Sequence, residues 1–275
     1  MRHDGQRMTD NFPHILIFGC GNMGGAMLDG WLSAGVAPEC FTVVDPFATG
    51  LPTGVRLYRS AAELNETFDV VLLGIKPQML AALAPDMAHL LTRGAIVISI
   101  LAGSGTSMLS AHFPDARIVR LMPNLAASIG KSPLGLFSEA LGKTEHSDVE
   151  TLLAPLGKRI WLDDEAQMDA VTALAGSGPA FVYRFIDALA QGGVAAGLPE
   201  DVAATLALSM TEGAALLAAR SDQSPAQLAA RVTSPGGTTA AGLSILDNQA
   251  ALAKLVEATL LAARDRGAEL AKGEI

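Results

Sequence analysis

The stretch HILIFGCGNMGGAMLDGWLSA, residues 14–34, decides the fold of this chain. Its first five residues form an apolar run that predicts a short strand, and the residues from Gly25 to Ala34 have the apolar pattern of a helix. The motif G-x-G-x-x-G lies between them, in the form Gly19-Cys20-Gly21-Asn22-Met23-Gly24. A glycine motif that joins a strand to a helix is typical of a dinucleotide-binding turn.

The three glycines of this motif have separate mechanical tasks. Gly19 permits the tight turn, Gly21 lets the backbone approach a pyrophosphate, and Gly24 lets the helix pack closely on the strand. The helix N-terminus adds roughly half a unit of positive charge for the phosphates. We therefore predict that a dinucleotide is bound by Gly19, Gly21, Asn22, Met23 and Gly24.

Strand and helix patterns alternate through the rest of the N-terminal half. Further strands are expected at Cys40–Asp45, Asp69–Ile75, Ala95–Ile100 and Arg117–Leu121, with helices at 61–66, 79–91 and 106–112. This alternation predicts an α/β fold with a doubly wound, Rossmann-type parallel sheet. Ligands of such sheets bind at the carboxyl ends of the strands. The expected cofactor-binding residues there are Asp45, Gly74, Ile75, Lys76, Pro77, Ala102, Gly103 and Asn124.

Asp45 bears on the choice between NADH and NADPH. A carboxylate at the end of the second strand usually hydrogen-bonds the ribose hydroxyls and favours NAD. Against the 2′-phosphate of NADP, a like charge at ~4 Å could cost a few kcal/mol at an effective dielectric of about 20. Arg56 and Arg59 could offset this cost, and Asp45 could instead be a turn residue before Pro46. Both cofactors stay open at this point.

The composition excludes several classes of protein. Hydrophobic residues make up 50% of the chain and charged residues 17%, which argues against disorder. The net charge of -9 argues against a nucleic-acid partner. No uninterrupted apolar run reaches the ~20 residues of a membrane span. Cys20 and Cys40 are too few for a disulfide framework or a metal site, so we expect a cytoplasmic protein with reduced thiols and no metal.

The strand pattern ends near residue 165, and alanine and leucine dominate from there. Helices are expected at 166–175, 178–196, 199–219, 226–232, 238–247 and 249–271. We therefore expect two domains, a dinucleotide-binding domain at 1–165 and a helical domain at 166–275. The helical segment is very apolar and dotted with glycine, which favours a core shared with a second subunit.

The run TSPGGTT, residues 233–239, interrupts the helical pattern on both sides. A proline and two glycines form the break, and a new helix is expected to begin at Thr238. Backbone N–H groups at the start of a helix are a ready anion site. The run by itself is compatible with an ordinary interhelical turn. In a chain that also carries a dinucleotide fingerprint, it favours a second site for a small molecule.

The chain resembles the pyrroline-5-carboxylate reductase family, and the resemblance runs through nearly its whole length. The most specific segment is PAQLAARVTSPGGTTAAGLSILD at 225–247. The other matching segments are Gly176-Ser177-Gly178-Pro179-Ala180, Gly192-Gly193-Val194, Gly197-Leu198-Pro199, Ile75-Lys76-Pro77-Gln78 and Met122-Pro123-Asn124. The resemblance implies reduction of the cyclic imine L-1-pyrroline-5-carboxylate to L-proline with NADPH or NADH, the last step of proline biosynthesis. It also implies a helical dimerisation domain and a homodimer with interlocked C-terminal helices, and it leaves a decamer of five dimers open.

The same resemblance implies roles for residues of the helical half. The N–H groups of Gly236, Gly237 and Thr238 suit the substrate carboxylate, with help from Ser234. The Thr239 hydroxyl is the candidate partner of the imine nitrogen, with helix capping as its alternative role. Thr172 and Ser177 are expected to line the pocket. Asp222 is interpreted as a helix cap, with a contact to the substrate amine as the alternative.

Three other functions remain open: a related imine reductase, a β-hydroxyacid dehydrogenase-like enzyme and a non-catalytic dinucleotide-binding protein. Hydroxyacid dehydrogenases depend on a lysine in the first long helix of their second domain. The corresponding helix here, Gly178–Ala196, contains no lysine. A non-catalytic binding protein has no need of a second anion site.

Overall fold

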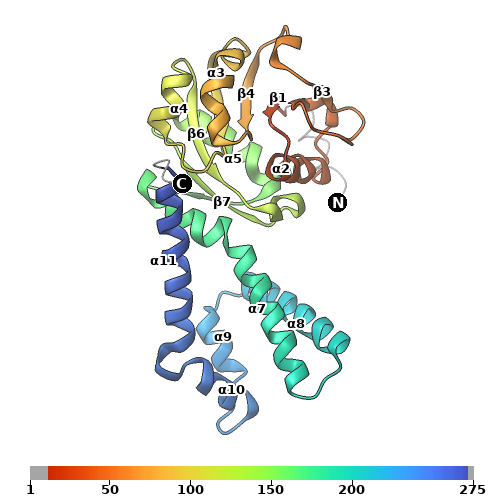
Figure 1. Ribbon diagram of the computed structural model, residues 1–275, viewed down its shortest axis with the longest axis vertical. Coiled ribbons are helices and arrows are strands. Elements are labelled where there is room, and N and C mark those ends of the chain that lie inside the picture. Colours follow the sequence, from red (N-terminus) through yellow and green to blue (C-terminus); the bar gives the residue numbers. More distant parts are fainter. Residues whose placement is uncertain (1–11, 272–275) are drawn as a thin grey trace. The chain divides into compact units, whose positions relative to one another are not determined.

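An eight-stranded sheet is the centre of the first structural unit in a computed structural model that describes residues 12–271 (Figure 1). The strand order is β3-β2-β1-β4-β5-β6-β7-β8, and only the β6–β7 pair is antiparallel. The chain order reverses between β1 and β4, which is where ligands of such sheets bind. The strands are β1 Ile15–Phe18, β2 Phe41–Val44, β3 Arg56–Tyr58, β4 Phe68–Leu73, β5 Leu91–Ser99, β6 Arg117–Met122, β7 Ser132–Phe137 and β8 Gly157–Trp161.

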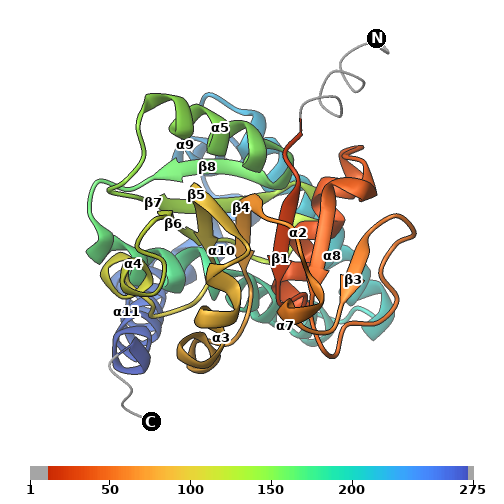
Figure 2. The same ribbon diagram turned by 90° about the horizontal axis from the view of Figure 1, so that it is seen from above.

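Helices cover both faces of this sheet, as Figure 2 shows from above. On one face α2 (Asn22–Ser33) and α5 (Lys143–Leu153) pack against alternate strand residues, among them Ile15 and Ile17. The intervening residues Leu16 and Phe18 face the opposite core under α3 (Leu80–Ala88) and α4 (Thr106–His112). Because both faces are buried, the central strands β1, β2 and β4 are nearly continuous apolar runs, as expected for a parallel sheet.

Three glycines bring β1, β4 and α2 together at one point. Gly19 has φ +91°, and a Cβ there would lie 2.8 Å from the Gly74 carbonyl carbon. A Cβ on Gly24 or on Gly74 would lie 2.5 Å from the Gly19 carbonyl oxygen. No side chain larger than hydrogen fits these positions without moving backbone, which confirms the mechanical tasks expected of Gly19 and Gly24.

Several expected elements differ from those observed. Strand β3, helix α5 and strands β7 and β8 were not predicted, because Pro133 and Gly135 interrupt the β7 pattern and β3 has only three residues. The helix expected at 61–66 is a single 3-10 turn, Ala61–Glu63, which is capped by the Ser60 hydroxyl. The helix expected at 79–91 ends at Ala88, since Leu91 already begins β5. The helix expected at 106–112 is confirmed as α4.

The chain divides into two units, residues 12–176 with 263–271, and Ser177–Ala262. The second unit consists of helices and turns. Its helices begin with α7 (Gly178–Ala195), and α8 (Glu200–Arg220) packs on α7 through small residues: a Cβ on Gly193 would lie 3.1 Å from the Ala203 Cβ. The remaining helices are α9 (Pro225–Arg231), α10 (Thr238–Leu246) and α11 (Ala251–Ala271), which continues into the first unit's range.

The second unit has almost no core of its own. Of its residues, all of which lie in the described part of the chain, only Ala203 and Ala207 are buried. Large apolar side chains on its helices are exposed, including Tyr183, Phe185, Leu206, Leu208, Met210, Leu217, Ile245 and Leu255. Exposed apolar surface on this scale is typical of an interface with another protein or with a membrane.

Helix α8 is also long and apolar enough to cross a membrane, judged by length and composition alone. It carries Glu200 and Asp201 in its first turn, Glu212 in its interior and Arg220 at its end. Its contact with α7 and its position within the apolar helical unit favour a protein interface for this helix.

His14 precedes β1 and provides a test of the first unit's stability. Its Nε2 lies 2.9 Å from the Arg56 Nη2 and 3.0 Å from the Thr42 Oγ1, and Arg56 also pairs with Glu66 at 2.7 Å. Burial lowers the pKa of His14, the Arg56 charge lowers this pKa further, and the Glu66 charge opposes both.

The unfolded chain therefore takes up a proton at residue 14 more readily than the folded chain. Stability should be retained above the ordinary His14 pKa of 6.5 and fall as the pH drops through it. We expect His14→Gln to reduce this loss, measured as the free energy of unfolding in urea between neutral and mildly acidic pH. His89→Gln is the control, because His89 is exposed; an unchanged pH dependence in His14→Gln would contradict the prediction.

Candidate active site

The glycine turn lies at the carboxyl end of β1 with the features of a pyrophosphate site. Gly21 is exposed, and a Cβ built on it would meet no atom within 4 Å. It is the N-cap of α2, and no side chain caps that helix. The first backbone N–H groups of α2, at Asn22 and Met23, are therefore left for an anion. The residues present fit a dinucleotide pyrophosphate.

Asp45, at the end of β2, is engaged with the backbone on two sides. Its Oδ2 accepts a hydrogen bond from the Cys20 N–H at 2.8 Å, and its Oδ1 accepts from Phe47 at 2.7 Å and Ala48 at 3.0 Å. The carboxylate thus joins the glycine turn to the loop after β2. Burial, together with the smaller effects of the Asp45 and Asp29 charges, raises the pKa of the Cys20 thiol to about 11, so this thiol is protonated at neutral pH.

The ends of β4 and β5 lie beside the glycine turn. The Gly74 N–H donates to the Phe18 carbonyl at 2.8 Å, and the chain then passes through Ile75 to the exposed Lys76 and Pro77. The Ile100 N–H donates to the Leu73 carbonyl at 3.1 Å, and the following loop exposes Ala102 and turns at Gly103, where φ is +71°. The structure therefore brings these predicted residues to the same sheet edge as the glycine turn.

Asn124 follows β6 at this edge, but its side chain is committed to the protein. Its Nδ2 donates to the Ala175 carbonyl at 2.9 Å, and its Oδ1 accepts from the Ala126 N–H at 2.9 Å. Its backbone N–H donates to the Ser132 hydroxyl at 2.9 Å, and the residue is only 6% exposed. Asn124 therefore anchors the segment around Ala175 to the sheet, and contact with a cofactor remains a proposal.

That segment is a π-helix, Thr172–Gly176, which follows α6 (Met168–Val171). A single helix was expected at 166–175. The Thr172 hydroxyl donates to the Met168 carbonyl at 2.8 Å, and Thr172 itself is partly buried. Turns of π-helix occur often at functional sites. Ser177 follows as the N-cap of α7, and its side chain makes no capping hydrogen bond.

An ion-pair cluster that the sequence did not reveal supports the loop after β5. The Glu165 carboxylate accepts hydrogen bonds from the Thr106 N–H at 2.7 Å, the Thr106 hydroxyl at 2.9 Å and the Arg120 Nη1 at 2.9 Å. The Arg120 side chain is 8% exposed. Burial raises the pKa of Glu165, but these hydrogen bonds outweigh it and lower the pKa overall. The cluster fixes the end of the Leu101–Gly105 loop to the sheet.

The Ser234–Thr239 turn lies in the second unit and is closed by a backbone hydrogen bond. The Gly237 N–H donates to the Ser234 carbonyl at 3.0 Å, and Gly236 between them has φ +69°. Pro at the second position and a left-handed glycine at the third are typical of a type II turn. Because its N–H is used in the turn, Gly237 offers no donor to a carboxylate in this conformation.

Helix α10 begins directly after this turn, at Thr238. Gly237 is its N-cap, and no side chain caps the helix. The Thr239 side chain makes no capping bond and is exposed, so capping is not its role in this structure. The neighbouring helix α9 is capped by Ser224, which forms a capping box with Gln227. The interpretation of Asp222 as that cap is therefore wrong, and Asp222 is exposed.

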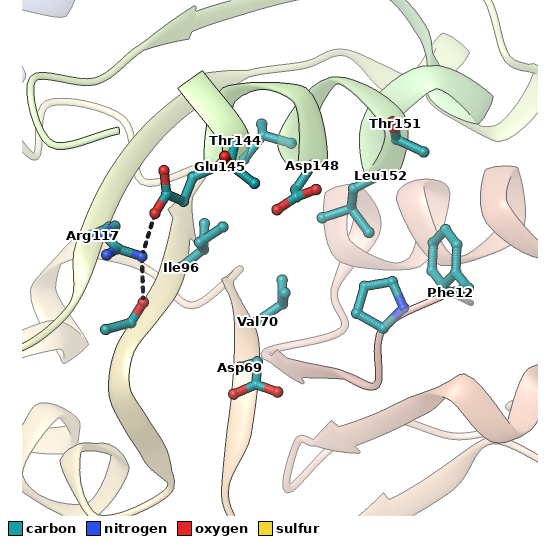
Figure 3. A pocket seen from close by; sticks show the side chains of 13 residues that line it. Phe12, Asp69, Val70, Ile96, Arg117, Thr144, Glu145, Asp148, Thr151 and Leu152 are labelled. Atoms are coloured by element: carbon teal, nitrogen blue, oxygen red, sulfur yellow. Dashed lines mark hydrogen bonds and ion pairs between the residues drawn. The ribbon is translucent and has the colours of Figure 1, made fainter. Parts of the chain in front are cut away.

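A cavity of about 590 Å³ lies at the opposite, amino edge of the sheet (Figure 3). In its wall, Arg117 contacts Glu145 at 2.9 Å and donates to the Gly94 carbonyl at 3.4 Å. Ligands of parallel sheets bind at the carboxyl ends of the strands, so this cavity is not the expected cofactor site. Within residues 12–271 no cluster of three or more His, Cys, Asp or Glu side chains could hold a metal ion.

The glycine turn, the doubly covered parallel sheet and the open helix N-terminus define a Rossmann-type dinucleotide-dependent oxidoreductase. Family comparisons agree with this class. Residues 14–103 match the family described as NADP oxidoreductase, coenzyme F420-dependent, and residues 165–270 match the pyrroline-5-carboxylate reductase dimerisation family.

Relatives of known name match almost the entire chain. The pyrroline-5-carboxylate reductase of Pseudomonas aeruginosa is 36% identical over 94% of this chain and 97% of its own length. The Arabidopsis thaliana enzyme is 35% identical over 92% and 94%. A solved pyrroline-5-carboxylate reductase from Coxiella burnetii has 30% identity and a TM-score of 0.86, covering 94% of this chain and 99% of its own. This chain belongs to the pyrroline-5-carboxylate reductase family.

The solved Plasmodium falciparum relative bears on the cofactor. It is a pyrroline carboxylate reductase with NADP bound, 27% identical, with a TM-score of 0.81, covering 94% of this chain and 98% of its own. An NADP-type cofactor is therefore the one that this fold accommodates in a related protein.

The Glu165 cluster generates a prediction about stability. Glu165→Gln removes the charge that pairs with the buried Arg120, so we expect a loss of about 2 kcal/mol in the free energy of unfolding at pH 7. Because the folded-state pKa of Glu165 is lowered, its contribution is present above the ordinary value of 4.5 and is lost as the pH falls below it. The difference between the two proteins should therefore shrink in acid, measured by urea denaturation.

Glu145→Gln is the matched control for this prediction. It breaks the Arg117–Glu145 pair, in which the arginine side chain is 42% exposed, and a pair of this kind contributes less than about 1 kcal/mol. Equal losses in the two variants would show that the Glu165 cluster is no more than a surface ion pair.

Proposed function

We propose that this chain reduces L-1-pyrroline-5-carboxylate to L-proline with NADPH or NADH. The observation that carries the proposal is the full-length likeness to pyrroline-5-carboxylate reductases, at 36% identity over 94% of the chain. The aligned part of the chain includes both the sheet edge that carries the glycine turn and the Ser234–Thr239 turn. The substrate contains a ring imine, which needs the reduced cofactor, and a carboxylate, which needs an anion site such as the turn.

The first unit is proposed to bind the cofactor. Gly19, Gly21, Asn22, Met23 and Gly24 would hold the pyrophosphate. The nicotinamide half would lie along the ends of β4, β5 and β6. The reduced nicotinamide supplies a hydride when bound, and the protein contributes position and electrostatics. The wall of that part of the site comprises Gly74, Ile75, Lys76, Pro77, Ala102, Gly103 and Asn124.

The turn of the second unit is proposed to bind the substrate carboxylate. The N–H groups of Gly236, Thr238 and the following first-turn residues lie at the start of α10, where the helix dipole favours a negative charge. Ser234 offers a hydroxyl at the same turn. Gly237 contributes by shape, because a Cβ there would collide with the Ser234 hydroxyl. Thr172 and Ser177 are proposed to line the substrate pocket.

Thr239 is proposed as the catalytic residue. Its hydroxyl is exposed and makes no capping bond, so it is available to hydrogen-bond the imine nitrogen. A protonated iminium is already electrophilic, so the reaction needs no strong general acid. The hydroxyl would accept a hydrogen bond from the iminium N–H and orient the ring. Hydride addition at the ring carbon would leave a neutral amine, which takes up a proton from water.

The assembly is proposed to be a homodimer with interlocked C-terminal helices, and a decamer of five dimers is a further proposal. The match to a dimerisation family over residues 165–270 and the nearly coreless helical unit support the dimer. We propose that the domain boundary lies near residue 165, where that family match begins. A cytoplasmic location is proposed, since Cys20 and Cys40 are both free.

The activity is tested by mixing purified protein with pyrroline-5-carboxylate and either NADPH or NADH. Loss of the reduced-cofactor absorbance and formation of proline are the expected results. No turnover with either cofactor, in a preparation that is folded and oligomeric, would refute the proposal. Turnover with other cyclic imines but not with this one would instead point to a related imine reductase.

The role of Thr239 yields a sharper prediction. Thr239→Val keeps the side-chain shape but removes the hydroxyl, so kcat should fall by about 100-fold while cofactor affinity changes less than twofold. Thr151→Val is the control, because Thr151 is an exposed residue of α5 whose hydroxyl bonds only within its own helix, to Ser147. Full activity in Thr239→Val would remove Thr239 from the reaction.

A further inference from the structure

Two arginines flank strand β3, and the structure places them at opposite edges of the sheet. Arg56 begins the strand and pairs with residue 42 at the start of β2. Its guanidinium donates to Glu66 and faces His14, both at the amino edge. Arg59 follows the strand and lies at the carboxyl edge, next to the loop after β2. Only Arg59 is therefore on the side where the cofactor's adenosine would lie.

Arg59 is anchored but still has free donors. Its Nη1 donates to the carbonyl oxygens of Asp45 at 3.1 Å and Ala48 at 2.7 Å. Its Nε and Nη2 make no hydrogen bond within residues 12–271, and the residue is exposed. A guanidinium that is held at one nitrogen and open at the others can bind a phosphate through two parallel hydrogen bonds.

Asp45, in contrast, has few free acceptor positions for the hydroxyls of a ribose. Three backbone N–H groups, from Cys20, Phe47 and Ala48, already donate to its two oxygens. A carboxylate that selects NAD does so by accepting hydrogen bonds from the ribose hydroxyls. Here the same carboxylate holds the glycine turn and the loop of residues 45–48 together, and these donors offset part of its charge.

We infer that Arg59 is the residue that recognises the 2′-phosphate of NADPH, and that Asp45 shapes the adenosine loop without selecting NADH. The inference rests on the proposed cofactor site at this edge of the sheet, but not on the identity of the substrate. It assigns the preference between the two cofactors to one exposed side chain, and it predicts that NADPH is the preferred cofactor.

The test is equilibrium binding of 2′,5′-ADP and 5′-AMP, the adenosine halves of the two cofactors, measured by calorimetry without substrate. The unmodified protein should bind 2′,5′-ADP at least about tenfold more tightly than 5′-AMP. Arg59→Gln should lose most of this preference by weakening 2′,5′-ADP alone, while 5′-AMP stays within about twofold. Arg59→Lys should retain part of it, because the charge remains.

Two further variants separate the roles of charge and loop. Arg93→Gln removes an exposed arginine from the amino end of β5 and should leave both affinities unchanged. Asp45→Asn disturbs the bonds that hold the loop, so it should weaken both ligands by a similar factor. An unaltered preference in Arg59→Gln would overturn the inference, as would tighter binding of 2′,5′-ADP by Asp45→Asn.

These outcomes are independent of the proposed reaction. If the protein binds 2′,5′-ADP through Arg59 but does not reduce pyrroline-5-carboxylate, the inference is supported and the proposed function is refuted. If the protein reduces pyrroline-5-carboxylate but its preference for 2′,5′-ADP does not depend on Arg59, the proposed function is supported and the inference is refuted. Because Arg59 is exposed, its variants are expected to fold, and thermal unfolding of each variant checks this directly.

Discussion

The close approach of three backbone segments at Gly19 is the constraint on which the first unit depends. The carbonyl oxygen of Gly19 lies against both Gly24 and Gly74, so β1, β4 and α2 meet where any Cβ would force them apart. This convergence lets α2 begin directly over the sheet edge with its first N–H groups uncapped. The dinucleotide site and the packing of the central strands therefore have the same physical origin.

The loops around that edge are stiffened by side chains that do not need to touch a ligand. Asp45 binds the glycine turn to the loop after β2, Asn124 fixes the π-helix, and Glu165 holds the start of α4. Each uses a side-chain oxygen to satisfy backbone N–H groups, or an amide to bond a carbonyl. Hydrogen bonds of this kind keep the loops of a binding site in a fixed geometry.

Much of this fold can be predicted from local sequence patterns. The parts that cannot be predicted depend on contacts between residues far apart in the sequence. The glycine turn, strand β1, helix α4 and the helices from α7 to α11 could be predicted, because each has a clear period and clear end signals. The Glu165 cluster could not, since its partners lie 45 and 59 residues away in sequence. Strand β8 alternates between partly buried and exposed residues and pairs only with β7, so its short pattern gave little signal.

The candidate site, too, could be predicted only in part from the sequence. The sequence indicates which residues reach the sheet edge, since that depends on where strands end. It does not indicate which of their polar atoms are already occupied. The bonds of Asp45 to Cys20, of Asn124 to Ala175 and of Gly237 to Ser234 all depend on the folded path of the backbone.

The lack of a core in the helical unit has a consequence for how this protein is maintained in solution. A segment that buries only two alanines in one chain must gain its stability from contact with another chain. Its folding and its assembly are then one equilibrium, and apparent stability rises with the logarithm of the subunit concentration. Dilution would act on the helical unit as a denaturant does on a monomer, so cellular abundance is itself part of what keeps that unit folded.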